Sequence, residues 1–148
     1  MISVEEALER ALALVSPLEA ETVALAEACG RFMCAPAVAR RDQPPFAASA
    51  MDGYALAGDP VAGDRFMLIG EAGAGHAFTG RVGPGEAVRI FTGAPLPAGT
   101  DRVVIQENVE AEGAAIRLTE ASESRNIRPA GQDFRAGDSR TIWRCWRR

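Results

Sequence analysis

The chain has 148 residues, of which 47% are hydrophobic and 24% are charged, so it is long enough and apolar enough for one globular domain or two small ones. It contains no lysine, and twelve arginines against twenty acidic residues give residues 1–139 a formal charge of −8. An acidic body without a basic stripe argues against nucleic acid as a partner, and no apolar run approaches the ~20 residues that cross a bilayer.

The N-terminal part of the chain predicts one helix followed by short irregular elements. Ser3 and Glu6 form a capping-box pattern, and apolar residues then recur at helical spacing over residues 4–15, before Pro17. Residues 22–25 favour a short strand, residues 26–29 a single helical turn, and residues 31–39 an extended segment. These elements are too few to build a core of their own.

Further along, the pattern changes to short apolar runs separated by turns. Fifteen glycines and nine prolines with only nine aromatic residues are typical of a mainly β protein. The predicted strands cover residues 54–56, 66–69, 87–91, 102–106 and 115–118. We expect a compact, barrel-like β subdomain at residues 42–124, inserted into a small α+β subdomain made of residues 1–41 and 125–139.

Two loops of this β region hold the residues with the clearest chemical potential, Asp52 and Thr92. Asp52 precedes Gly53 at the expected start of a strand, and Thr92 ends the strand at residues 87–91. Pro95 and Pro97 then stiffen the chain, which would hold the threonine hydroxyl still. Each motif alone has a plainer interpretation, as a turn dipeptide or as the end of a strand.

An aspartate beside a fixed hydroxyl could orient a phosphate, an oxyanion or a metal-bound water through charge-assisted hydrogen bonds. The carboxylate itself repels phosphate, so a cation or neighbouring N–H groups would have to offset its charge. The sequence does not identify that cation.

Four ordered motifs carry a resemblance to a known family. They are FAASAMDGYA at residues 46–55, RIFTGAPLP at residues 89–97, VVIQE at residues 103–107 and NIR at residues 126–128. The chain, from its first residues to about Asp138, resembles the N-terminal region of the MoeA and gephyrin E-domain family of molybdopterin molybdenumtransferases. The family loop more often has Phe-Asp-Asn-Ser where this chain has residues 46–49, so the two polar side chains of that loop are absent here.

The resemblance implies a fold, a reaction and a shared site. The family reaction inserts molybdenum from molybdate into adenylylated molybdopterin, with hydrolysis of the adenylate and a need for Mg²⁺. In the family the active site is a cleft shared by two protomers, so this chain would carry half of it and be inactive alone. We therefore expect a homodimer, or a heterodimer with a full-length homologue.

The site residues follow from the same resemblance. Asp52 and Thr92 carry over as catalytic residues, and no metal ligand is assigned. The residues that carry over with loop-shaping or substrate-binding roles are Ser49, Gly53, Gly93 and, more weakly, Glu107.

Other features support more than one interpretation. His76 lies in a glycine-rich loop without a metal-binding partner at usable spacing, and the loop lacks the ending of a P-loop. Three cysteines without metal-like spacing and no secretory signal favour a reduced, cytoplasmic protein. The alternative function is a non-catalytic dimerisation or partner-binding module. An independent hydrolase is disfavoured because no activated base accompanies Thr92.

The end of the chain departs from the rest in composition. Residues 140–148 contain both tryptophans and four arginines but no acid. Plausible codons for residues 142–147 spell Leu-Ala-Leu-Leu-Ala in a neighbouring frame, which resembles the helix that opens the next domain in the family. Our hypothesis is a frameshift that truncated a longer enzyme, which the downstream coding DNA would test. Surfaces that normally pack on the missing domains would then be exposed and apolar.

Overall fold

The computed structural model describes residues 2–16, 18–121 and 124–140. It divides into two compact units, one of Met1–Ala37 with Arg140–Arg148 and one of Val38–Ser139. Residues 141–148 of the predicted tail lie outside the described residues. Within the described ranges, no helix is long and apolar enough to cross a membrane.

The first unit contains the predicted N-terminal helix, α1 (Val4–Leu12). The Ser3 hydroxyl accepts a hydrogen bond from the Glu6 backbone N–H at 3.1 Å, as the capping pattern predicts, and no residue of α1 is buried. The strand predicted at residues 22–25 is wrong: the chain there is irregular and leads into a short 3₁₀ helix, η1 (Leu25–Glu27). A two- or three-residue apolar run forms a strand only where a partner strand accepts its hydrogen bonds.

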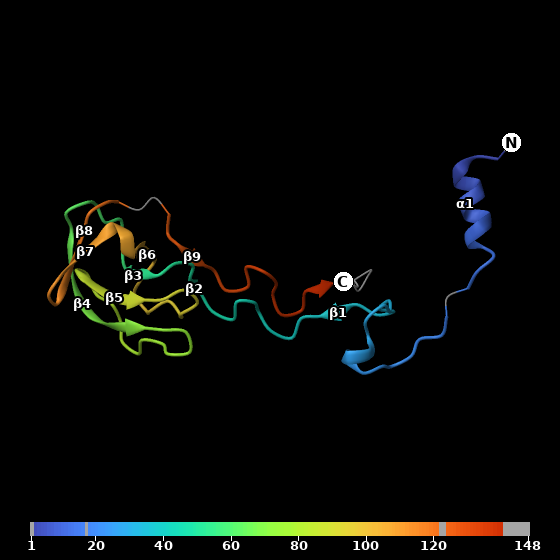
Figure 1. The fold of residues 1–148 in the computed structure, drawn as a ribbon, viewed down its shortest axis with the longest axis horizontal. Helices are drawn as coiled ribbons and strands as arrows, with labels where there is room; N and C mark the ends of the chain where they lie inside the picture. The colour runs from blue at the N-terminus through green and yellow to red at the C-terminus, as the bar shows by residue number, and fades with distance from the viewer. Residues whose placement is uncertain (1, 17, 122–123, 141–148) are drawn as a thin grey trace. The chain divides into compact units, whose positions relative to one another are not determined.

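The second unit is built on a six-stranded sheet with the order β6-β3-β5-β4-β8-β7. Its strands are β3 (Gly53–Leu56), β4 (Arg65–Ala72), β5 (Glu86–Ile90), β6 (Arg102–Ile105), β7 (Val109–Glu112) and β8 (Ala115–Leu118). The pair β4–β5 is parallel and the other pairs are antiparallel. Figure 1 shows this sheet curled into a half-barrel, which confirms the prediction of a mainly β, barrel-like fold with an N-terminal helix.

Both faces of the sheet are buried, because successive residues of the central strands enter different clusters. One cluster contains Ala55, Val88 and Val103, and the other contains their neighbours Leu56, Ala87 and Val104. This explains why the central strands are short, continuously apolar runs. Strand β7, with the sequence Val-Glu-Ala-Glu, escaped prediction because it is short and half of its residues are glutamate, which is uncommon in strands.

Two chain segments leave the sheet together. In the first segment, β1 (Ala37–Val38) and β2 (Ala48–Ser49) pair with β10 (Ser139–Arg140) and β9 (Ile127–Arg128) of the second, and η2 (Gln106–Asn108) follows β6. Backbone hydrogen bonds, such as that from Gln43 N–H to the Phe134 carbonyl at 2.8 Å, hold the two segments side by side (Figure 1). This arrangement accords with a β region entered and left by adjacent segments, while the exact subdomain bounds at residues 41–42 and 124–125 stay a prediction.

Candidate active site

The sheet brings Asp52 and Thr92 together at one end. Asp52 directly precedes β3 and Thr92 lies two residues past the end of β5, and these strands pair antiparallel with Gly53 opposite Ile90. The start of β3 therefore lies beside the end of β5. The Thr92 hydroxyl donates to Asp52 Oδ1 at 2.7 Å, and the Thr92 backbone N–H donates to the same oxygen at 2.7 Å.

This geometry sets the charge state of the carboxylate. The hydrogen bond from the Thr92 backbone N–H is the main cause that lowers the pKa of Asp52 below its ordinary value, and the hydroxyl bond adds to it. Partial burial opposes the shift, and the positive charge of Arg89 supports it. Asp52 is therefore ionised at neutral pH, with its carboxylate fixed in direction.

The loop around Thr92 is held by backbone hydrogen bonds to the segment before β3. Gly93 N–H donates to the Ser49 carbonyl at 2.9 Å, and Ser49 N–H donates to the Ala94 carbonyl at 3.0 Å. Gly93 has φ of 82°, in the left-handed region that favours glycine. The turn that presents the Thr92 hydroxyl thus depends on a glycine directly after it.

Ser49 and Gly53 have structural roles in the same loop. The Ser49 side chain is buried, and its hydroxyl donates to the Met51 carbonyl at 2.6 Å, which shapes the turn before Asp52. Gly53 lies so close to β6 that an added Cβ would stand 2.0 Å from the Val104 carbonyl oxygen. A direct contact of Ser49, Gly53 or Gly93 with substrate stays a prediction.

Glu107 stands apart from the pair. It lies in η2, it is exposed, and its carboxylate accepts a hydrogen bond from Gln106 Nε2 at 3.3 Å. The structure gives it no hydrogen bond to Asp52 or Thr92 within the described residues. The His76 backbone closes a tight turn with Gly73.

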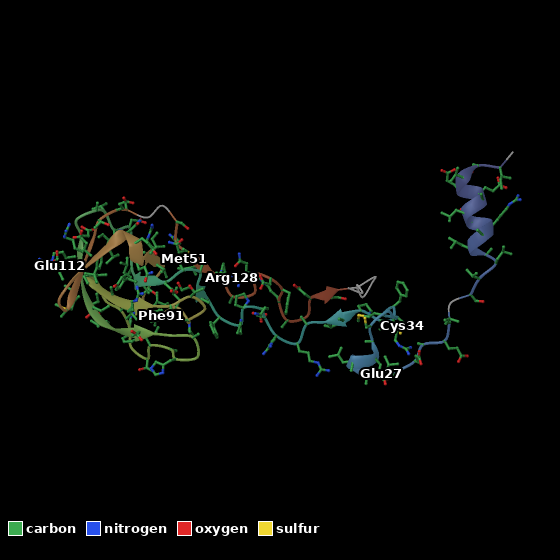
Figure 2. The ribbon with its side chains drawn as sticks, in the orientation of Figure 1. Glu27, Cys34, Met51, Phe91, Glu112 and Arg128 are labelled. Carbon is green, nitrogen blue, oxygen red and sulfur yellow. The ribbon has the colours of Figure 1, made fainter. Side chains whose placement is uncertain are left out.

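An open groove of about 500 Å³ begins at the Thr92 loop. Its wall includes Ser49, Thr92, Gly93, the partly exposed ring of Phe46, and Arg128. Met51, Phe91 and Arg128 lie toward the end of the sheet from which the paired segments leave, whereas Glu112 lies at the other end (Figure 2). The groove could accommodate part of a small molecule against the threonine hydroxyl.

Sequence reasoning missed Arg89, the cation near Asp52. Its side chain donates to the Gly53 carbonyl and to Gln106 Oε1, and its charge acts on the Asp52 carboxylate. The available signal was an arginine between apolar neighbours in a strand, a position where a charge needs partners.

The fold and the site define a class of protein: a half-barrel β domain that presents an ionised carboxylate and a fixed hydroxyl at one end of its sheet. Residues 2–140 match the family model described as the MoeA N-terminal region (domain I and II). The chain belongs to this family.

Curated relatives and solved structures agree with this assignment. The chain is 34% identical to the molybdopterin molybdenumtransferases of Staphylococcus aureus strain N315, over 144 residues, and of Haemophilus influenzae, over 142 residues. It is also similar to the crystal structure of a molybdopterin biosynthesis MoeA protein from Pyrococcus horikoshii OT3, with 32% identity and a TM-score of 0.80. That match covers 95% of this chain and 39% of the other.

The coverage is asymmetric in the curated relatives as well. The matches to the Staphylococcus and Haemophilus proteins span 93% of this chain but 34% and 35% of those proteins. The chain thus spans about a third of the length of these relatives.

Proposed function

We propose that this chain supplies one half of an active site that inserts molybdenum from molybdate into adenylylated molybdopterin. The observation that supports this proposal is the contact between Asp52 and Thr92, made at the edge of a groove in a member of a family whose relatives are named molybdopterin molybdenumtransferases. The other half, including the pterin-binding surface, comes from a second protomer. That protomer is a full-length homologue, and the resulting heterodimer acts in the cytoplasm.

The two side chains have different tasks in this proposal. A carboxylate whose pKa is lowered is a weak base at neutral pH, so Asp52 orients a donor, such as the water that hydrolyses the adenylate, rather than taking its proton. The Thr92 hydroxyl donates a hydrogen bond to Asp52. The lone pairs of the Thr92 oxygen therefore stay available to accept a hydrogen bond from a substrate group. The groove then admits the substrate beside Thr92 and Gly93.

Magnesium is expected from the family resemblance, but the described residues do not assemble a site for it. Among them, no three His, Cys, Asp or Glu side chains are grouped so that they could hold a metal ion. Mg²⁺ usually takes one or two carboxylates from a protein together with substrate phosphates and water, so Asp52 could supply one oxygen ligand while the substrate and the second protomer supply the rest. We assign no magnesium-dependent step to the residues of this chain alone.

A second candidate function is a non-catalytic dimerisation or partner-binding module. The apolar side chains of Val4, Leu8 and Leu12 follow one another at helical spacing on α1 and are 80%, 58% and 60% exposed. Such a stripe usually packs on another element. A module of this kind would need the helix but not the carboxylate.

Mixing the chain with an intact family enzyme tests both functions. We expect the chain alone to insert no molybdenum, and to form a mixed dimer detectable by light scattering after size-exclusion chromatography. The double variant Asp52→Asn, Thr92→Val should still form the mixed dimer. Molybdenum insertion by the chain alone would overturn the half-site proposal, and failure to associate would overturn both functions.

A further inference from the structure

Arg89 lies in β5, the strand that leads to Thr92, and its guanidinium group is held by two aromatic rings. Its guanidinium carbon lies 5.0 Å from the centre of the Tyr54 ring and 4.9 Å from the centre of the Phe91 ring. Tyr54 is directly opposite Arg89 in the β3–β5 ladder, and Phe91 is two residues further along, so all three side chains project from the same face. Cation–π contacts with both rings hold the guanidinium group in place.

From this position the guanidinium group holds the chain at Asp52 and directly after it. Nη1 donates to the carbonyl of Gly53, the residue after Asp52, at 3.3 Å. Nη2 donates to Gln106 Oε1 at 2.6 Å, and the Gln106 backbone N–H donates to the Asp52 carbonyl at 3.1 Å. Arg89 thus connects β5 directly to β3. It also connects β5 to η2 through the side chain of Gln106, and the Gln106 backbone holds Asp52.

The charge of Arg89 and its hydrogen bonds both help to hold Asp52 in place. The guanidinium group attracts the Asp52 carboxylate, and it lies on the strand that also delivers the Thr92 donors. One strand therefore provides both the cation and the hydroxyl that fix the carboxylate. The sheet holds other arginines, such as the exposed Arg65, which pairs with the half-buried Glu112 at 2.6 Å.

We propose that Arg89 is a positioning residue, which keeps the Asp52 carboxylate directed at the Thr92 N–H and hydroxyl by holding the backbone around Asp52. Arg89 itself does not touch the substrate in this proposal. Its consequence for turnover rests on the proposed function, but the contact between Asp52 and Thr92 can be measured without any turnover.

Two variants of the full chain separate the hydrogen bonds of Arg89 from its charge. Arg89→Gln removes the charge, and Arg89→Lys keeps the charge but loses the planar, forked donor group and its stacking. Arg65→Gln is the matched control, because it removes an exposed arginine from the same sheet. Each variant is studied by NMR in two ways. The rate of hydrogen exchange is measured at the Thr92 amide, and the pH at which Asp52 becomes protonated is followed through the chemical shift of the same amide.

We expect the Thr92 amide to exchange about tenfold faster in both Arg89 variants, the factor that corresponds to loss of one hydrogen bond to a charged group. Arg89→Gln should also move the protonation of Asp52 to higher pH, and Arg89→Lys should largely restore it. Arg65→Gln should leave both quantities unchanged.

Wild-type exchange at Thr92 in Arg89→Lys would overturn the proposal, and this variant decides the matter even if Arg89→Gln does not fold. Equal acceleration at all amides of the sheet would likewise overturn it, because that result indicates a global loss of stability. Failure of molybdenum insertion would leave these NMR results untouched, so the two proposals can fail separately.

Discussion

Replacing Gly53 with alanine should both destabilise the β unit and disturb the site. The new Cβ would lie 2.0 Å from the Val104 carbonyl oxygen, 2.9 Å from its carbonyl carbon and 3.1 Å from the Ile105 Cα. All three atoms belong to the backbone of β6, so no side-chain rotation relieves the clash. Overpacking typically costs 1–3 kcal/mol, and a backbone obstacle places this substitution near about 3 kcal/mol, more than 100-fold in the unfolding constant.

Urea unfolding, followed by Tyr54 fluorescence and by circular dichroism, measures this effect. With an m value of about 1–3 kcal/mol/M, the midpoint should fall by about 1 M or more. Gly73→Ala is the matched control, because Gly73 has no positive φ and nothing lies within 4 Å of its added Cβ. Gly93→Ala isolates backbone strain, since its φ is 82° and its surroundings are open, and should cost about 1–2 kcal/mol. If the free energies of unfolding of Gly53→Ala and Gly73→Ala agree within about 0.5 kcal/mol, β3 and β6 do not approach as closely as described.

Three further predictions concern pH, the loop and the helix. Because the pKa of Asp52 is lowered on folding, the ionised carboxylate stabilises the fold above the ordinary aspartate pKa, and this stabilisation is lost as the pH falls through the lower pKa of the folded state. Thr92→Val removes the hydroxyl bond, so the two pKa values should lie closer together and urea midpoints taken from about pH 2 to 6 should depend less on pH. Ser49→Ala removes a buried hydroxyl that donates to the Met51 carbonyl, and should cost about 1 kcal/mol in the same assay; an unchanged midpoint would contradict its loop-shaping role. Ser3→Ala removes the cap of α1 and should reduce the helical signal at low temperature, by about 1 kcal/mol of helix stability, whereas Ser16→Ala, outside the helix, should not.

Much of the fold could be predicted because its signals are local. The capped helix and the five apolar strand runs each depend on a few adjacent residues, and all six were found with ends that differ by a few residues. The short ladders β1–β10 and β2–β9 could not be predicted, since two-residue strands exist only through hydrogen bonds to a distant segment. Strand β7 could not be predicted either, because half of its residues are glutamate and its place depends on the ladder that it forms with β8.

The candidate site, like the fold, could be predicted where its signals are local and could not be predicted where they depend on distant residues. Asp52 and Thr92 could be selected because strand ends and stiff loops are visible in the sequence, and the antiparallel register then brings them into contact. Arg89 could not be assigned a role, because its effect depends on Gln106 and Gly53, which belong to other strands or follow them. The reason for a glycine at position 53 also required the distance to β6.

The most direct measurement is rescue of molybdenum insertion in a full-length family enzyme that has lost its own counterparts of Asp52 and Thr92 by substitution. This chain is added in excess, so that mixed dimers place its half-site against the pterin-binding domain of the disabled enzyme. The account predicts that the wild-type chain restores insertion, whereas a chain with Asp52→Asn and Thr92→Val binds equally well but restores none. Equal restoration by both chains, or none by either despite mixed dimers, would contradict the claim that Asp52 and Thr92 serve the reaction.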